Sequence, residues 1–323
     1  MDEDELPEAL AALLAPVVDD ASVEVADFRR LSGGASRQTW AFRLVGSDRS
    51  EPLVLQRERP GPLDAGGAME VEASLLAAAA AEGVPVAPLV VTHRDADALG
   101  APYLVSRFVD GETIARKILR DERFASARAD LAAECGRALA AVHRIPTDAA
   151  PGLENEDQLT RFRAILDALG QAHPAFELAF RWLDRHRPAT AGTAVVHGDF
   201  RLGNLIVDER GLRAVIDWEL AHLGDPMEDL GWLCVKAWRF GGELPVGGFG
   251  TYEQLFDAYE AAGGGPVDPE VVAWWQMLGT LKWGIMCIIQ AATHLSGTSR
   301  SVELAAIGRR VCENEADLLE MLP

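Results

Sequence analysis

Val195-Val-His-Gly-Asp-Phe-Arg-Leu-Gly-Asn-Leu-Ile-Val207 and Ala214-Val-Ile-Asp-Trp-Glu219 carry more structural information than any other segments of this chain. Their apolar runs, rich in β-branched residues, predict short strands with polar residues at the strand ends. Asp199 and Asn204 fall in the loop between the first two strands, and the next strand ends on Asp217. This pattern therefore predicts two carboxylates and an amide held together by short strands.

These three side chains match the needs of phosphoryl transfer from ATP. That reaction requires a carboxylate beside the attacking hydroxyl and oxygen ligands for the Mg²⁺ ion on the triphosphate. We expect Asp199 to orient the hydroxyl, and Asn204 and Asp217 to bind Mg²⁺. Each residue alone is also typical of an ordinary turn, but the fixed spacing of the three favours a site.

Other residues near this loop have two interpretations each. Arg201 is either a catalytic charge that neutralises the transferring phosphoryl group or a loop arginine paired with a nearby acid; we favour the former. His197 follows two valines, so we expect it to be buried and to position the loop. Asp225-Pro-Met-Glu-Asp229 opens a helix that Asp225 can cap, and we expect Asp225 and Asp229 to brace the catalytic loop.

The rest of the pattern predicts an α+β fold of two lobes. Residues 1–107 contain five predicted strands, at 23–30, 38–45, 51–57, 88–92 and 102–108, with helices at 5–18 and 68–82. Residues 108–323 are mostly helical, apart from the strands around 193–217, and should hold the catalytic loop and the substrate pocket. A small β-rich lobe beside a larger helical lobe predicts a cleft between them.

Two further features of the first lobe concern phosphate. Ser32-Gly33-Gly34-Ala35-Ser36 lies between two predicted strands, and its small residues would let main-chain N–H groups approach a phosphate. A simple hairpin turn would have the same composition. Glu72, on the helix after the third strand, could pair with a phosphate-binding cation; a solvated helical glutamate is the plainer interpretation.

Composition narrows the class of protein. The 323 residues carry a formal net charge of −20, which disfavours non-specific binding to nucleic acid or to an anionic membrane. The four cysteines are scattered, which indicates reduced thiols in the cytoplasm and no zinc site. The acidic N-terminus does not resemble a signal peptide, and charges or glycines interrupt the apolar runs before they reach the length that spans a bilayer. Nothing in the sequence indicates an oligomeric state.

The motifs as a set resemble those of the aminoglycoside phosphotransferase-like small-molecule kinases, which have a bilobal protein-kinase-like fold. HGDFRLGN at 197–204, IDWE at 216–219 and DPMEDLGW at 225–232 resemble the catalytic signature. LVLQRERPG at 53–61 and LKWGIMCIIQ at 281–290 are most similar to the subgroup related to kinase-like domains attached to acyl-CoA dehydrogenases. The resemblance implies that Asp199 is the catalytic base, that Asn204 and Asp217 hold Mg²⁺, and that the main chain from Arg107 to Val109 binds adenine.

One departure from the family pattern keeps alternatives open. The family's third strand often ends in a lysine that pairs with the helix glutamate and binds phosphate, but this chain has no lysine before Lys117. Gln56 or Arg57 occupies the position, and Arg57 is able to bind phosphate bidentately. Three hypotheses follow: a kinase for a small-molecule hydroxyl, such as a hydroxy acid or hydroxyacyl thioester; a kinase that inactivates aminoglycosides; and a non-catalytic binding module with a kinase fold.

Overall fold

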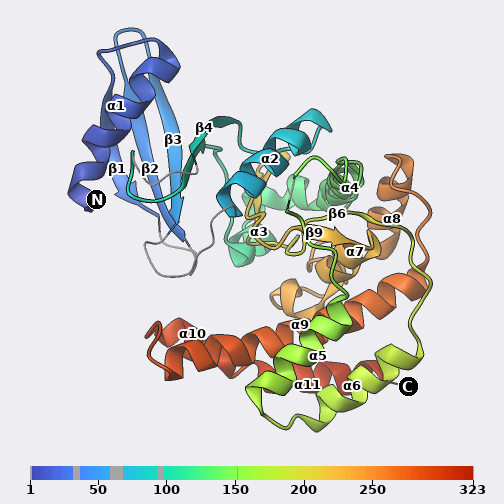
Figure 1. Cartoon of the computed structure of the whole chain (residues 1–323). Helices are drawn as coiled ribbons and strands as arrows, with labels where there is room; N and C mark the ends of the chain where they lie inside the picture. The colour runs from blue at the N-terminus through green and yellow to red at the C-terminus, as the bar shows by residue number, and fades with distance from the viewer. Residues whose placement is uncertain (1, 32–36, 59–67, 94–97, 151, 323) are drawn as a thin grey trace.

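The computed structural model describes residues 2–31, 37–58, 68–93, 98–150 and 152–322. Within them the chain forms two lobes, a five-stranded sheet with two main helices and a larger helical part (Figure 1). The α+β bilobal fold predicted from the sequence is confirmed. The predicted phosphate loop, residues 32–36, lies outside the described residues.

The sheet of the N-terminal lobe is antiparallel throughout. Its strands are β1 (Glu24–Arg30), β2 (Arg37–Val45), β3 (Ser50–Glu58), β4 (Leu89–His93) and β5 (Tyr103–Arg107). They lie in the order β1-β2-β3-β5-β4. Each strand falls within two residues of its predicted bounds, because β-branched residues favour the strands and turn residues mark where they end. The sheet ends at Arg107, where we place the boundary between the lobes.

The two faces of this sheet have different functions. Helix α1 (Leu6–Val18) covers one face with Leu6, Leu10 and Leu14, which pack in one buried cluster with Trp40 and Leu55 of the strands. Helix α2 (Ala68–Ala81) contacts β4 and β5 and lies on the side of the sheet toward the helical lobe (Figure 1). Its Glu72 lines a pocket together with residues of the other sheet face. Since side chains alternate along a strand, each position belongs to one face only.

The helical lobe surrounds four short strands. Its helices are α3 (Ala115–Arg120), α4 (Ala125–Val142), α5 (Gln158–Leu169), α6 (Pro174–Arg185), α7 (Met227–Cys234), α8 (Tyr252–Ala261), α9 (Pro269–Leu295), α10 (Val302–Gly308) and α11 (Val311–Met321). Its strands are β6 (Ala194–Val196), β7 (Leu205–Asp208), β8 (Gly211–Val215) and β9 (His222–Gly224). Three short 3₁₀ turns, Glu3–Glu5, Glu122–Phe124 and Lys236–Arg239, complete the described elements.

Helix α9 is the central element of the helical lobe. It packs against α5, α6, α7, α10 and α11 (Figure 1). Among the described helices, α9 alone is long and apolar enough to cross a membrane, but 72% of its most apolar window is buried inside the protein. Its apolar character is therefore accounted for by packing, as in a core helix.

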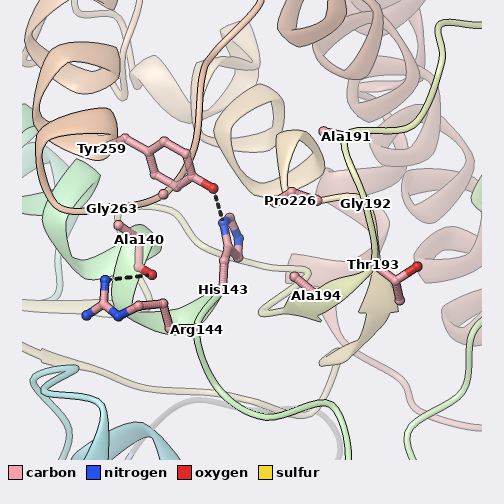
Figure 2. Close-up of a pocket in the computed structure, with 11 residues that line it drawn as sticks. Ala140, His143, Arg144, Ala191, Gly192, Thr193, Ala194, Pro226, Tyr259 and Gly263 are labelled. Atoms are coloured by element: carbon pink, nitrogen blue, oxygen red, sulfur yellow. Dashed lines mark hydrogen bonds between the residues drawn. The ribbon is translucent and has the colours of Figure 1, made fainter.

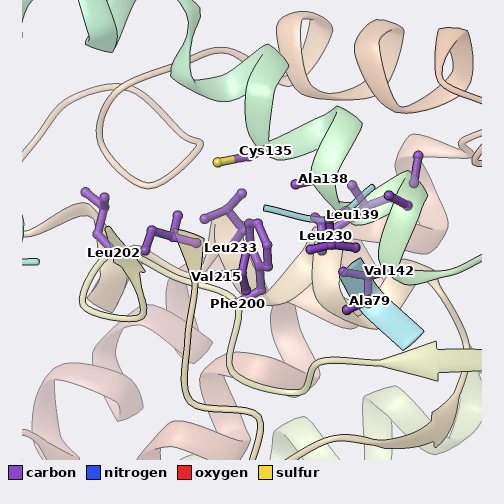
Figure 3. Close-up of a cluster of buried hydrophobic side chains, with 14 of the residues drawn as sticks. Ala79, Cys135, Ala138, Leu139, Val142, Phe200, Leu202, Val215, Leu230 and Leu233 are labelled. Carbon is purple, nitrogen blue, oxygen red and sulfur yellow. The ribbon is translucent and has the colours of Figure 1, made fainter. Parts of the chain in front are cut away.

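The catalytic segment is anchored in the largest hydrophobic core. Phe200 and Leu202, on either side of Arg201, are fully buried among Cys135 and Leu139 of α4 and Leu233 of α7 (Figure 3). Burying large apolar side chains stabilises their position by roughly 1.5–3 kcal/mol each. The segment that carries the predicted catalytic residues is thus held by packing on both sides.

Candidate active site

Two small sheets position the catalytic segment. Strand β6 pairs with β9, and β7 pairs with β8, so the loop from His197 to Asn204 is tied at both ends. Gly198 has a φ of +77°, and a Cβ there would lie 2.4 Å from the main-chain oxygen of Leu220. Only glycine fits such a backbone without strain, which explains the His-Gly-Asp order.

A buried carboxylate braces the start of this loop. Asp229 of α7 is fully buried, and its two oxygens accept hydrogen bonds from the N–H groups of His197 (2.8 Å) and Gly198 (2.9 Å). His143, at the end of α4, lies 3.2 Å from the same carboxylate through Nε2 and 2.8 Å from the Tyr259 hydroxyl through Nδ1 (Figure 2). The predicted bracing role is confirmed for Asp229.

Asp225 caps the helix, as its sequence predicts, but the expected bracing role is wrong for this residue. Its carboxylate accepts hydrogen bonds from the N–H groups of Met227 (2.9 Å) and Ala191 (2.8 Å). It therefore caps α7 and ties the segment before β6, but it makes no hydrogen bond to the catalytic loop. His197 is fully buried, as predicted, and its Nδ1 accepts a hydrogen bond from the Asp199 N–H at 3.2 Å.

The carboxylate of Asp199 is held from three sides. Oδ1 accepts hydrogen bonds from Arg201 Nε (2.9 Å) and Trp232 Nε1 (3.0 Å), and Oδ2 accepts one from Asn204 Nδ2 (2.6 Å). The Arg201 guanidinium also stacks over the Trp238 ring at 4.5 Å. Arg201 is thus paired with a nearby acid, one of its two predicted roles. With its donors fixed, Asp199 is pre-organised rather than mobile.

A pocket of about 480 Å³ lies between the lobes. It is lined by apolar side chains, including Val54, Ile206 and Val215, and by the predicted hinge from Arg107 to Val109. The N–H groups of Arg107 and Phe108 donate to the main-chain oxygens of Pro88 and Pro52. Of the three hinge N–H groups, only that of Val109 makes no hydrogen bond to a described residue. An apolar slot beside an unpaired main-chain donor suits a flat heterocycle.

The polar end of this pocket suits a divalent cation. Asn204 and Asp217 both line it, and Asn204 uses its amide nitrogen on Asp199, so its oxygen is the atom available for a metal. Burial, together with the carboxylates of Glu219, Asp199 and Glu72, raises the pKa of Asp217 to about 7. Crowded carboxylates destabilise one another unless a cation lies among them, and carboxylate and amide oxygens are ligands that Mg²⁺ prefers.

The expectation that Arg57 faces this pocket is wrong. Arg57 lies on the α1 face of the sheet, where it donates to Gln38 Oε1 (2.8 Å) and the Leu99 carbonyl oxygen (2.8 Å). Its guanidinium carbon also lies 5.3 Å from the centre of the Trp40 ring. The adjacent residue, Gln56, lines the pocket instead. The strand alternates faces, so only one of the two neighbours can point into the cleft.

Sequence reasoning missed the buried cation of the pocket. Arg37, the first residue of β2, lines the pocket and forms an ion pair with Glu72 of α2. Both residues are nearly buried, with 9% and 3% of their surface exposed. Glu72 therefore does pair with a cation, as its predicted role required, but with one from β2. The signal in the sequence was weak, because an arginine beside a glycine-rich turn is usually a surface residue.

A second buried charge network was also missed. Lys282 of α9 donates to the Gly198 carbonyl oxygen (3.3 Å) and to Glu228 (3.2 Å), and Glu228 also pairs with His222 at 3.1 Å. Burial lowers the pKa of His222, but Glu228 more than offsets this, so the net pKa is raised. With Asp229 on its N–H and Lys282 on its carbonyl, Gly198 is bound by charged groups from two helices.

Comparison with known proteins agrees with this geometry. A family model described as the phosphotransferase enzyme family matches residues 27–275. The chain belongs to this phosphotransferase family. The match spans both lobes and includes Asp199, Asn204 and Asp217.

Solved structures share the fold of this phosphotransferase. A protein of Ralstonia eutropha, provisionally described as an aminoglycoside phosphotransferase, is 24% identical, with a TM-score of 0.77 and 97% of each chain covered. A spectinomycin phosphotransferase, solved with ADP and spectinomycin, is 14% identical, with a TM-score of 0.66, 98% of this chain covered and 99% of that chain. At these identities the likeness shows the kinase-like fold.

Curated relatives are longer than this phosphotransferase. Acyl-CoA dehydrogenase family member 10 of Mus musculus is 30% identical in an alignment of 217 residues that covers 62% of this chain and 20% of that protein. The probable acyl-CoA dehydrogenase IBR3 of Arabidopsis thaliana is 28% identical in an alignment of 228 residues that covers 62% of this chain and 27% of that protein. The chain thus matches only a part of each relative. The family and the fold together show a small-molecule kinase, as predicted.

Proposed function

We propose that this phosphotransferase moves the γ-phosphoryl group of Mg²⁺-ATP to a hydroxyl group of a small molecule. The observation that carries the proposal is the arrangement of three side chains: Asn204 and Asp217 line the polar end of an apolar pocket between the lobes, and Asp199 is hydrogen-bonded to Asn204. The solved relative with bound ADP supports a nucleotide as the occupant of the corresponding cleft. The short connection from Asp217 to Asp225 leaves no room for the activation segment of a protein kinase, which favours a small acceptor.

In this proposal each residue of the chain has one task. Asn204 and Asp217 would hold Mg²⁺, and the hinge from Arg107 to Val109 would hold adenine. Asp199 would accept a hydrogen bond from the acceptor hydroxyl and orient it, and would take its proton as transfer proceeds. Arg201 holds Asp199 in place and supplies positive charge beside it. Bound Mg²⁺-ATP supplies the transferable group and a metal ion that neutralises its charge.

For the acceptor, we propose a hydroxy acid or a hydroxyacyl thioester. The matches to acyl-CoA dehydrogenase family members support this class. An aminoglycoside is the second candidate, supported by the names of the solved relatives. A binding module without turnover is the third, and it would bind nucleotide weakly or without regard to Mg²⁺.

Calorimetric titration of ATP, with and without Mg²⁺, tests the nucleotide site. We expect Mg²⁺-dependent binding that Asp217→Ala weakens at least tenfold, while Asp257→Ala, an exposed position on α8, leaves it unchanged. Binding whose affinity is unchanged without Mg²⁺ and in Asp217→Ala would instead favour the binding module. A panel of hydroxyacyl thioesters, hydroxy acids and aminoglycosides with γ-labelled ATP then identifies the acceptor. Undiminished transfer by Asp199→Asn would refute the assigned base.

A further inference from the structure

The third strand presents no cation to the pocket. In the antiparallel pair of β2 and β3, Gln56 stands opposite Thr39, and both line the pocket together with Val54. Arg57 is turned to the α1 face. A triphosphate carries several negative charges, so a site that holds it needs positive charge close to the phosphates. The neutral amide of Gln56 does not supply that charge.

Arg37 is placed where such a charge is needed. It lies on the same sheet face as Thr39 and Gln56, two residues from Thr39 along β2. Three cations among the described residues line the pocket, and two of them, Arg29 and Arg107, are exposed. Arg37 is therefore the buried one, at the pocket end that also contains Asp217.

Glu72 holds Arg37 without using all its donors. The ion pair engages Nη1 of the guanidinium, and a guanidinium carries five N–H donors in a rigid fork. Burial opposes the charge, but Glu72, Glu219 and Asp217 outweigh it, so the pKa of Arg37 is raised. Arg37 thus stays a cation at every pH of interest, and among the described residues its guanidinium donates only to Glu72, which leaves N–H groups to meet a phosphate.

We propose that Arg37, fixed by Glu72, binds the non-transferred phosphates of the nucleotide. Arg37, the first residue of the second strand, would have the role that a cation on the third strand has elsewhere in the family, and Gln56 stands at that third-strand position. This inference rests on the proposed function, since it assumes that the pocket holds a nucleotide. It makes Arg37 a binding residue and Glu72 the residue that positions it.

The test compares nucleotides with and without phosphates. We expect Arg37→Gln to raise the Kd for Mg²⁺-ATP at least tenfold, about 1.4 kcal/mol, and to change the Kd for adenosine less than twofold. Arg30→Gln is the control, because it removes one exposed charge from the same sheet at a position that does not line the pocket; its Kd for Mg²⁺-ATP should change less than threefold. Arg37→Gln/Glu72→Gln gives the same comparison without an unpaired buried carboxylate, should the single variant fail to fold.

A rescue experiment separates a phosphate contact from a structural role. In Arg37→Gln/Glu72→Gln, adding Gln56→Lys places a cation back on the pocket face, and we expect it to recover part of the lost Mg²⁺-ATP affinity. Equal losses for ATP and adenosine, or no loss for ATP, would overturn the inference while leaving the proposed function intact. Failure of the wild-type chain to bind ATP at all would overturn the proposed function and this inference with it.

Discussion

Of the substitutions whose effect follows from the structure, removal of the Asp229 carboxylate should lower the free energy of unfolding most. Both oxygens of Asp229 are used, by the N–H groups of His197 and Gly198, and none of the side chain is exposed. Asp229→Ala leaves both N–H groups buried without their acceptor and leaves His143 without its carboxylate. The variant therefore disturbs the backbone that carries Asp199 without touching Asp199 itself.

The expected loss follows from these contacts. A buried donor left unsatisfied costs about 1–3 kcal/mol, and two are created, so Asp229→Ala should lower the free energy of unfolding by about 2–6 kcal/mol. Asp229→Asn keeps one acceptor oxygen and turns an NH₂ group toward the second N–H. We expect it to lose about half as much as the alanine variant.

The pH dependence of stability gives an independent check. Burial alone would raise the pKa of Asp229, but the contacts with His143 and His197 hold it below its usual range. A carboxyl with a lowered folded-state pKa stabilises the fold above its unfolded pKa of about 4, and that stabilisation is lost as pH falls through the lower folded value. Asp229→Asn should remove this contribution and flatten the stability profile in the acidic range.

Urea unfolding followed by tryptophan fluorescence measures these losses. Trp40 is the single tryptophan before residue 180, so the signal reports mainly on the helical lobe. Asp257→Ala, an exposed change on α8, should stay within about 0.5 kcal/mol of wild type. A loss below 1 kcal/mol for Asp229→Ala would mean that the brace does not hold the loop, and the argument from its hydrogen bonds would fail.

Three further changes have outcomes that the structure specifies. Gly198→Ala should lower the free energy of unfolding by more than about 2 kcal/mol, because the added Cβ meets a main-chain oxygen at 2.4 Å. Gly83 has a φ of +84° but no neighbour within 4 Å of an added Cβ, so Gly83→Ala should lower the free energy of unfolding by only about 1 kcal/mol. Lys282→Met should lower the free energy of unfolding by about 3 kcal/mol. The loss should grow as pH rises through the raised pKa of His222, because Glu228 then loses its other cation. Urea unfolding at pH 6 and pH 8.5 measures the difference, and an equal loss at both pH values would contradict it. A thiol reagent should modify one cysteine in the native chain, the exposed Cys312, and Cys312→Ser should abolish the reaction.

The catalytic loop could be predicted from the sequence because its information is local. Asp199, Asn204 and Asp217 each stand beside a short apolar strand, and the distance along the chain between them fixes which strand end they occupy. Asp229 could be predicted for the same reason, since a helix that starts just after the loop must lie near it. Residues within one supersecondary unit are placed by propensity and spacing alone.

The cation of the pocket could not be predicted in this way. In Leu53-Val-Leu-Gln-Arg-Glu58 both faces of the strand begin with apolar residues, so alternation does not show whether Gln56 or Arg57 meets the cleft. The packing of α1 on one face decides it, and α1 lies more than thirty residues away along the chain. Arg37 and Glu72 are likewise brought together only by the folded sheet. The pairing of β6 with the three-residue strand β9 was missed for the same reason.

Two buried charges of the helical lobe, Asp229 and Lys282, contact the same residue, Gly198. Asp229 of α7 binds the N–H of Gly198, and Lys282 of α9 binds its carbonyl oxygen, so two helices grip the residue directly before Asp199. A buried ion pair is often no more stabilising than an apolar pair of the same shape, which makes stability alone a poor reason for these charges. Apolar side chains, however, cannot satisfy main-chain N–H and C=O groups that are buried away from water, whereas hydrogen-bonding groups satisfy and orient them. The charges therefore serve to position the carboxylate of Asp199, and substitutions on α9, far from the pocket in sequence, should alter turnover more than they alter nucleotide affinity.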